Sequence, residues 1–453
     1  MTSEATKSQD RYQAAFHDLQ ANGSKGVPSW LQRLRERAMD HFETLGFPAV
    51  TDEEWKYTNV APIARADFSP VVAIGGSAPV ITGDQISQFT YAEARDSRLV
   101  FVNGLLRSDL SSLSNAPDAV VAIGLDEALN NERFSEVVRE YLARVVEHQA
   151  NGFTALNTAF AGNGAFVFIP KGVAVNSPLH LLFLSQAPGP GAQANSAGFP
   201  RVLVVAEENS SATIIESYAG LDDALYFTNA VVEVVLKDGA RLTHYRVQDE
   251  NARAFHITTT GAQLGRHSSF DTTNIALGAK LSRHNVSVIM DHEGAECWVD
   301  GLYLVGDEQH TDTHSVIDHK QPHCTSHQLY KGILDGKSRA VFNGKVFVRH
   351  GAMGTDANQT NKNLLLSNDA HVDTKPQLEI FADDVKCAHG AAIGQLDEDE
   401  LFYLTSRGIH MDLARNLLTY GFAEEVIAKI KIESIKAQLD EAVLNRIHAR
   451  LEA

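Results

Sequence analysis

Residues 364–408, LLLSNDAHVDTKPQLEIFADDVKCAHGAAIGQLDEDELFYLTSRG, contain the change of pattern that decides the fold. The first part alternates apolar and polar residues, as in Gln377–Ile380 (QLEI), which is typical of a half-buried strand. The last part is helical in character, because Asp397 and Glu400 form a capping pattern just before Leu401. We therefore expect a strand-rich body to end here and a helical tail to begin.

The composition is that of a folded protein with a large core. Of 453 residues, 44% are hydrophobic and 21% are charged. A formal net charge of −18 argues against nucleic acid or an anionic membrane surface as the main partner. No apolar run approaches the roughly 18 residues that span a bilayer, and the N-terminus lacks the apolar segment of a signal peptide.

The cysteines are few and unpaired in sequence. Cys297, Cys324 and Cys387 form no CxxC motif, and an odd number without short spacings favours a reducing compartment over a disulfide framework. Together with the missing signal peptide, this predicts a cytoplasmic protein.

The order of patterns along the chain predicts a mainly β fold with helices at both ends. Helical patterns run from Ser29 to Gly46 and from Leu125 to about Gln149. From Phe166, strand-like runs follow one another for more than two hundred residues with no helix between them, so a βα alternation is excluded. We predict an N-terminal helical region with a linker and short strands over 1–150, a β core over 151–390 and a C-terminal helical region over 391–453.

A weak repeat points to the kind of β architecture. Turns followed by small residues are centred on Ala212, Ala240, Ser268, Ala295 and Ala370, at intervals of 28, 28, 27 and 75 residues, the last interpreted as three steps of 25. A repeat near 25 residues made of short strands favours the coils of a parallel β-helix. A large sandwich with regular turns remains the alternative.

Motifs for nucleotide or acyl-enzyme chemistry are absent from the sequence. It contains no GxxxxGK[ST], no GxSxG, no HExxH and no GxGxxG between a strand and a helix. If the protein takes part in ATP-driven work, another chain must supply the ATPase.

The densest group of possible metal ligands lies between His310 and His327, where five His, two Asp and Cys324 occur close together. On strands, same-face neighbours are two residues apart, and His310, His314 and His319 do not keep one parity. A hydrogen-bonded ladder of polar side chains along the coils is therefore the favoured interpretation, and a metal site the alternative.

Cys387 and His389 have the spacing that the longer cluster lacks. On a strand, both side chains fall on one face, with Cα atoms about 6.5–7 Å apart. Zinc or iron needs about four ligands, so this pair is half a site, and the rest would come from a partner or from distant residues. A buried thiol beside a hydrogen-bonded imidazole is the alternative.

Several stretches together carry a family resemblance. From about residue 25 onward the chain resembles the SufB/SufD family of iron–sulfur cluster assembly scaffolds, and Lys375–Ile409 is similar to its SufD branch. At 352–354 the chain has Ala-Met-Gly where the family usually has a Gln-Lys pair. Other matching stretches are Gly46–Pro48, Glu54–Thr58, Phe101–Gly104, Phe153–Asn157, Pro170–Val173, Pro200–Tyr218, Tyr330–Ile333, Thr355–Ala357 and Asn363–Ser367.

The resemblance implies a right-handed parallel β-helix core flanked by N-terminal and C-terminal α-helical regions. It also implies a non-catalytic scaffold that forms a heterodimer with SufB through the β-helix edge and supports cluster assembly and iron acquisition. Cys387 and His389 would be metal ligands shared with SufB, at an interface that holds a transient iron–sulfur cluster or iron. No cofactor would stay bound to this chain alone, and a homodimer could form without SufB.

The same resemblance implies a second partner. The C-terminal helices would dock the SufC ATPase, with Phe402, Tyr403, Leu404, Arg407 and Gly408 as the candidate contact residues. ATP-driven dimerisation of SufC would then twist the paired β-helices and open the interface to iron and sulfur. Two other functions remain as alternatives, a self-contained metal carrier and a β-helix carbohydrate-active enzyme that uses the residues between His310 and His327.

Overall fold

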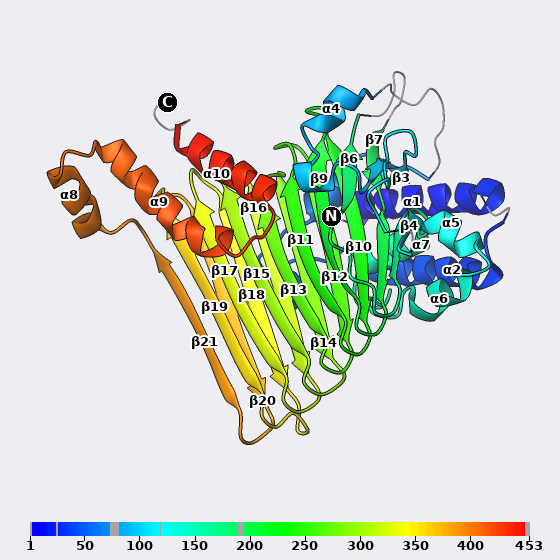
Figure 1. Cartoon of the computed structure of the whole chain (residues 1–453). Coiled ribbons are helices and arrows are strands. Elements are labelled where there is room, and N and C mark those ends of the chain that lie inside the picture. Colours follow the sequence, from blue (N-terminus) through cyan, green and yellow to red (C-terminus); the bar gives the residue numbers. More distant parts are fainter. Residues whose placement is uncertain (1, 24–25, 73–80, 118, 188–193, 449–453) are drawn as a thin grey trace.

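Two long β-sheets, wound from one chain, form the body of the molecule in the computed structural model. The structure describes residues 2–23, 26–72, 81–117, 119–187 and 194–448. Within these residues, the two sheets have eleven and ten strands, and successive strands of the core alternate between them. Each sheet is almost entirely parallel, as expected for a chain that coils in one direction (Figure 1). The fold is a parallel β-solenoid, which confirms the predicted class.

The first sheet has the order β20-β18-β16-β14-β12-β10-β8-β5-β4, with β7 beside β10 and β1 beside β7. Its strands are β1 (Phe68–Pro70), β4 (Val121–Gly124), β5 (Gly164–Ile169), β7 (Asn195–Gly198), β8 (Arg201–Ala206), β10 (Tyr226–Leu236), β12 (Phe255–Leu264), β14 (Leu281–Met290), β16 (His310–His319), β18 (Arg339–Val348) and β20 (His371–Ile380).

The second sheet has the order β21-β19-β17-β15-β13-β11-β9-β6-β2-β3. Its strands are β2 (Arg98–Val102), β3 (Leu105–Leu106), β6 (Leu179–Ser185), β9 (Ser211–Gly220), β11 (Arg241–Asp249), β13 (Ser269–Ala276), β15 (Glu296–Val305), β17 (Thr325–Leu334), β19 (Asp356–Leu365) and β21 (Lys386–Gly394).

Inward-facing residues stack in register through the coils and build the core. Because side chains alternate along a strand, every second residue of each strand enters the space between the sheets. One such row, paired strand to strand and apolar throughout, contains Val234, Ala262, Val288, Ile317 and Val346.

The coils are longer than the predicted repeat of 25 residues. Phe255 pairs with Leu281, 26 positions on, and Arg339 pairs with His371, 32 positions on. Four of the predicted turns do stack at one edge, where Asn209 N–H donates to Asp238 C=O. The fifth, at 368–370, joins β19 to β20 and lies at the other edge of the coil, so the division of the last interval into three equal steps was wrong.

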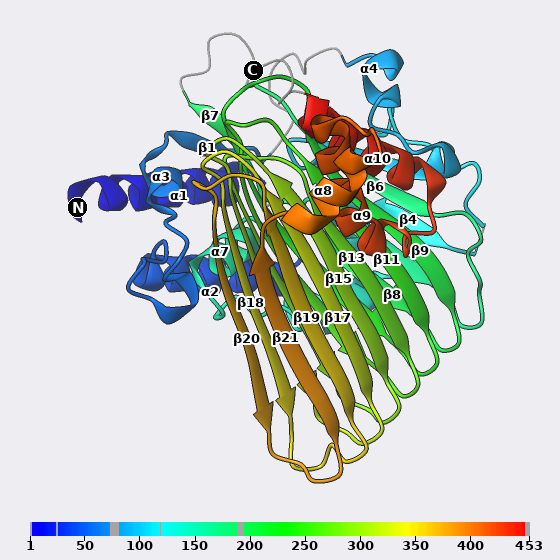
Figure 2. The same ribbon diagram turned by 90° about the vertical axis from the view of Figure 1, so that its left-hand side faces the viewer.

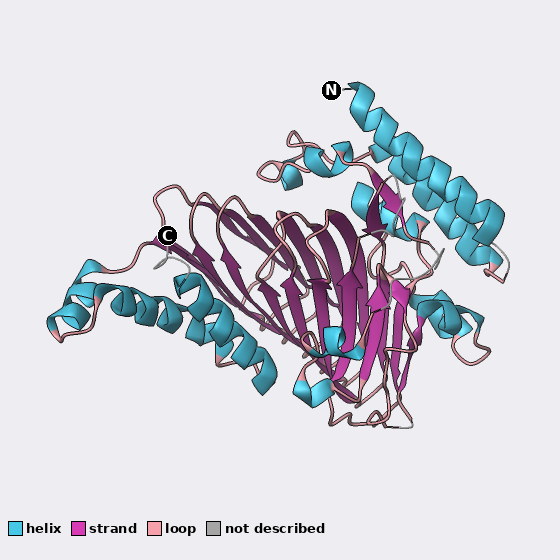
Figure 3. Ribbon diagram, turned by 90° about the horizontal axis from the view of Figure 1, so that it is seen from above, coloured by secondary structure: helices cyan, strands magenta, loops and turns pink. Residues whose placement is uncertain are grey.

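The N-terminal helices lie at the end of the solenoid where the chain enters it (Figures 1 and 3). Helix α2 begins after Pro28 and ends at Leu45, as its sequence pattern predicts. The elements of this region are α1 (Thr2–Gly23), α2 (Ser29–Leu45), the 3₁₀ turn η1 (Glu53–Trp55), α3 (Ala61–Arg65), α4 (Gly83–Ser87), the 3₁₀ turn η2 (Ala92–Ala94), α5 (Leu125–Asn130), α6 (Ser135–Tyr141) and α7 (Gly152–Ala159).

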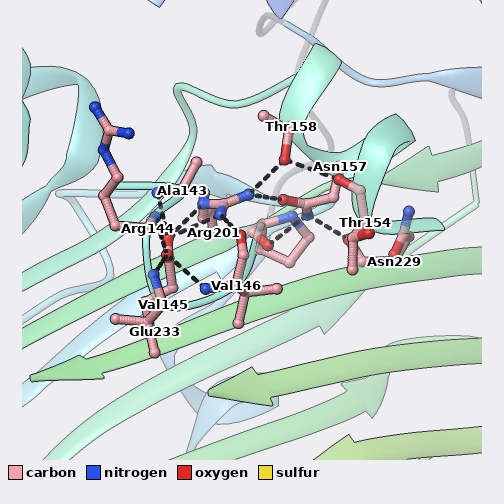
Figure 4. A network of polar contacts seen from close by, with 11 residues as sticks. Ala143, Arg144, Val145, Val146, Thr154, Asn157, Thr158, Arg201, Asn229 and Glu233 are labelled. Carbon is pink, nitrogen blue, oxygen red and sulfur yellow. Dashed lines mark hydrogen bonds and ion pairs between the residues drawn. The ribbon is translucent and has the colours of Figure 1, made fainter. Parts of the chain in front are cut away.

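The helical pattern predicted over 125–149 ends early, because a buried carboxylate takes the backbone that follows. After Tyr141 the chain bends around Glu233, whose carboxylate is fully buried. This carboxylate accepts hydrogen bonds at 2.9–3.1 Å from the backbone N–H groups of Ala143, Arg144, Val145 and Val146 (Figure 4). Four donors converge on one carboxylate, an arrangement that an α-helix cannot supply.

Arg201 completes this cluster from the neighbouring strand. Its guanidinium donates to Glu233 at 2.9 Å and to the side chains of Asn157 and Thr158 at 3.0 Å (Figure 4). The network therefore fixes α7 and the loop after α6 onto β8 and β10.

The C-terminal region consists of α8 (Glu398–Ser406), α9 (Met411–Ile427) and α10 (Glu433–His448). The second half of α9 and the part of α10 from Ile435 to Val443 pack on the outer face of the second sheet. There Val426 and Ile435 join an apolar cluster with Leu302 and Ile333. Helix α8 instead extends away from the solenoid (Figures 1 and 3).

Candidate functional site: the open end of the solenoid and its helical tail

The last coil of the solenoid ends in two free strand edges. Strands β20 and β21 are the terminal strands of their sheets, and each pairs on one side only among the described residues. Figure 2 views the molecule from this end, with both strands in front. Their outer backbone donors and acceptors are therefore open to another chain.

Gln377–Ile380 forms part of β20, as predicted, but the expected alternation of burial is absent. Residues 373–379 are all partly buried, because one more coil would be needed to cover their inward faces.

Cys387 and His389 both lie on β21, on the face that continues the solenoid interior. Cys387 pairs in register with the buried Ala357, and His389 with Gln359. Cys387 is half-buried against the apolar core, whereas His389 is exposed. Burial, assisted by the nearby Asp356 carboxylate, raises the pKa of the Cys387 thiol. A metal or positive charge brought to this end would favour the thiolate.

Beneath His389 the interior is polar rather than apolar. Gln359 is fully buried and donates to the side-chain oxygen of Gln328 at 2.7 Å. Next to it, the buried Asn361 accepts a hydrogen bond from Thr374 at 2.9 Å. The in-register neighbours of His389 inside the solenoid are therefore amide side chains rather than apolar ones.

Large apolar side chains surround the open end. Ile380 ends β20, Phe381 follows it, and Ile393 lies on β21; all three are exposed. Exposed apolar groups beside free strand edges are typical of a surface that another protein covers.

The predicted docking residues of the tail lie on α8 and just after it. Phe402 is 72% exposed and Tyr403 is 56% exposed, the guanidinium of Arg407 lies over the Tyr403 ring at 4.8 Å, and Leu404 is half-buried. Gly408 has a φ of +84°, which suits the glycine that ends this helix turn. The exposed apolar surface continues along α9 with Met411, Leu413 and Leu417.

Polar contacts hold the base of the tail to the solenoid. The buried Lys331 ammonium on β17 donates to the backbone carbonyl of Phe422 at 2.8 Å, and Lys429 pairs with Asp300 at 2.7 Å. The second half of the tail is therefore fixed to the strands of the second sheet.

The His310–His327 cluster is divided between several environments. His310 and His314 face outward on β16, while His319 faces inward and hydrogen-bonds Ser326 at 2.8 Å. The imidazole of His314 lies between the carboxylates of Asp312 and Glu54, at 3.2 and 3.3 Å. Among the described residues no group of three or more His, Cys, Asp and Glu side chains is placed to hold a metal ion.

The partner of these outward residues is the N-terminal segment Glu53–Thr58. Trp55 is buried, with the Arg283 guanidinium 3.7 Å from its ring centre, and Thr58 donates to Asp312 at 2.5 Å. Nothing in the sequence of this segment indicates which strand receives it.

No helix in the part of the chain that the structure describes is both long enough and apolar enough to cross a membrane.

Comparisons with known proteins place the chain in a family. Residues 190–422 match the family model described as "SUF system FeS cluster assembly, SufBD core domain", and residues 6–181 match "SufBD protein N-terminal region". The chain belongs to the SufBD family. The core model of the SufBD family covers the solenoid from β7 through β21 and continues into α9.

Individual relatives agree with this assignment along nearly the whole chain. An iron–sulfur cluster assembly SufBD family protein of Synechocystis sp. is 37% identical, over 94% of this chain and 93% of its own length. The iron–sulfur cluster assembly protein SufD of Escherichia coli is 33% identical, over 98% of this chain and 97% of its own length. SufD of Bacillus subtilis is 28% identical, over 93% of this chain and 94% of its own length. The predicted resemblance to the SufB/SufD family, and to its SufD branch, is confirmed.

Proposed function

We propose that the chain is a non-catalytic scaffold subunit that joins a SufB-type solenoid through the free edges of β20 and β21. A nascent iron–sulfur cluster would form at this junction and be handed on. His389 would supply an imidazole ligand and Cys387 a thiolate, and the remaining ligands would come from SufB. Iron supply to the junction would be part of the same role.

One observation carries this proposal: the Cys-x-His pair lies on the inward face of the last strand of an open solenoid. A second solenoid stacked there would enclose both side chains in a new interior while pairing the free strand edges. The exposed Ile380, Phe381 and Ile393 would add apolar area to the interface. Two ligands on one chain cannot complete a tetrahedral iron environment, which agrees with a site shared between two chains.

The test is reconstitution of the assembled complex with a His389→Ala variant. The complex is expected to form normally while cluster formation, followed by visible absorbance and iron content, falls sharply. His292→Ala is the matched control, since His292 is exposed on a turn in the middle of the solenoid. If His389→Ala built clusters at the rate of the wild type, a ligand role for His389 would be excluded.

A SufC-type ATPase is the second proposed partner, bound by Phe402, Tyr403, Leu404, Arg407 and Gly408. Exposed aromatic and aliphatic groups on a helix that leaves the body are suited to a groove on another protein. Co-purification with the tagged chain tests this: an ABC-type ATPase and a second β-solenoid chain should both be recovered. Recovery of the chain alone would contradict both partner assignments.

Coupling between the two sites is proposed to be mechanical. When the ATPase subunits dimerise, they would pull on α8 and α9, and the solenoid would transmit the movement to its open end. Alkylation of Cys387 in the assembled complex measures this movement, with the buried Cys297 and Cys324 as slow internal references. Labelling of Cys387 should accelerate when ATP is added, and an unchanged rate would refute the coupling.

A further inference from the structure

A pocket of about 360 Å³ lies in the N-terminal region, away from both proposed interfaces. It opens between α1, α2, α5 and the loop that follows α7. Its walls are largely apolar, formed by Leu19, Leu31, Leu129 and Phe160. A concave apolar pocket of this volume is typical of a small-molecule site, and the chemistry of its ligand depends on the polar groups that line it.

The decisive polar group is Arg35. Its side chain lines the pocket although the residue is only 9% exposed, and its Nε–H donates to the backbone carbonyl of Ala161 at 2.7 Å. Among the described residues no carboxylate forms an ion pair with this guanidinium, and its terminal nitrogens make no hydrogen bond there. Burial, with no charged neighbour contributing, lowers the pKa of Arg35 to about 10.

The backbone around Arg35 holds the guanidinium in one place. A Cβ atom added at Gly162 would lie 2.4 Å from Nη2 of Arg35, so only glycine allows the side chain to approach this closely. The side chain is thus fixed by Ala161 and Gly162 while its terminal nitrogens remain free for a partner. A buried guanidinium without a counter-charge is unfavourable, and an incoming anion would restore the balance.

We propose that this pocket binds a small organic carboxylate with an apolar body, held by the Arg35 guanidinium. Guanidinium and carboxylate match as a planar, two-pronged hydrogen-bonded pair. The apolar walls favour a carboxylate with a hydrocarbon body over inorganic phosphate, and the exposed Asp18 and Asp126 at the pocket repel highly charged anions. This inference does not depend on cluster assembly.

Calorimetric titration of the full chain with octanoate tests the proposal, and octanamide serves as the neutral ligand of the same body. Saturable octanoate binding is expected. The affinity of the wild type for octanamide, and that of Arg35→Gln for octanoate, should each be lower by about tenfold or more, because a hydrogen bond to a charged group is lost. No saturable binding, equal binding of octanoate and octanamide, or undiminished binding to a folded Arg35→Gln variant would overturn it.

A second pair of variants keeps Arg35 intact, in case Arg35→Gln does not fold. Asn130 is exposed and lines the pocket, so Asn130→Trp should block it and abolish binding. Glu127→Trp places the same bulky group on the same helix outside the pocket and should bind octanoate as the wild type does. Equal octanoate binding by these two variants would place the ligand elsewhere and refute the assignment.

Discussion

Replacing Glu233 with glutamine is expected to be among the most damaging single-atom changes in this chain. The change exchanges one carboxylate oxygen for an NH₂ group in a fully buried position. If the remaining oxygen keeps the N–H groups of Arg144, Val145 and Val146, the new NH₂ faces the N–H of Ala143 and the guanidinium of Arg201. Two donors then lose their acceptor, and the guanidinium loses its counter-ion.

The magnitude follows from these losses. Each buried donor left without an acceptor costs about 1–3 kcal/mol, and removal of one member of a buried ion pair costs about 3–5 kcal/mol in total. We therefore expect Glu233→Gln to lower the free energy of unfolding by about 3–5 kcal/mol. The loss should begin locally, in the loop after α6, before the strands are affected.

Two measurements check the prediction at these two levels. Urea unfolding followed by tryptophan fluorescence gives the midpoint and slope for the whole chain. Hydrogen–deuterium exchange of the amides of residues 143–146 gives the local opening. Glu296→Gln makes the same chemical change at an exposed position on β15 and should leave both unchanged. A loss below about 1 kcal/mol, with residues 143–146 still protected, would refute the assigned role of the buried carboxylate.

Three further predictions follow from contacts described above. Burial disfavours the charged form of His314, but Asp312 and Glu54 outweigh this effect and raise the pKa of His314 above its ordinary value. The ion pairs of His314 therefore stabilise the fold below about pH 6.5, and this stabilisation is lost as the pH rises through the raised pKa. Hydrogen exchange of the amides of residues 53–58, corrected for the intrinsic rate, should be faster at high pH, and His314→Gln should remove that dependence. Phe402→Ser should weaken binding of the proposed ATPase about tenfold. The unfolding midpoint should stay unchanged, because Phe402 is largely exposed. If calorimetry gave the variant and the wild type the same affinity for the ATPase, the docking surface would be contradicted. Lys331→Met should expose the tail to limited proteolysis and cost about 2–3 kcal/mol, because a buried charge-assisted hydrogen bond to α9 is lost. Unchanged proteolysis would show that the apolar packing and the Lys429–Asp300 pair hold the tail without Lys331.

The parts of the fold that were predictable from the sequence depend on local pattern. The shared face of Cys387 and His389 follows from strand parity, and the cap at Asp397 is present, with its side chain accepting from the backbone N–H of Glu400. The length of the coil was harder to predict because each coil has two turns. The turn at 368–370 resembles those of the opposite edge in composition, so intervals counted across both kinds give too short a repeat.

Contacts between segments far apart in the sequence could not be predicted from local sequence patterns. Thr58 and Asp312 are 254 positions apart, and nothing near either residue indicates the other. Likewise, the apolar spacing of Leu142 and Val145 fits a helix, but the buried carboxylate of Glu233 binds that stretch of backbone instead. In both cases a charged group on the solenoid, rather than the local propensity of the segment, determines where the chain goes.

The two ends of the solenoid differ in a way that limits how far the protein can assemble. At the entry end, β3 and β4 run antiparallel to their neighbours and close each sheet with a short strand, and α5 packs against β4 and β5. The exit end instead presents two long parallel strands with free edges, β20 of ten residues and β21 of nine. If the proposed partner binds at these two strands, the capped entry end leaves the chain able to join a single second chain by this route. End-to-end association then stops at a pair, and growth into a fibre by this route is blocked.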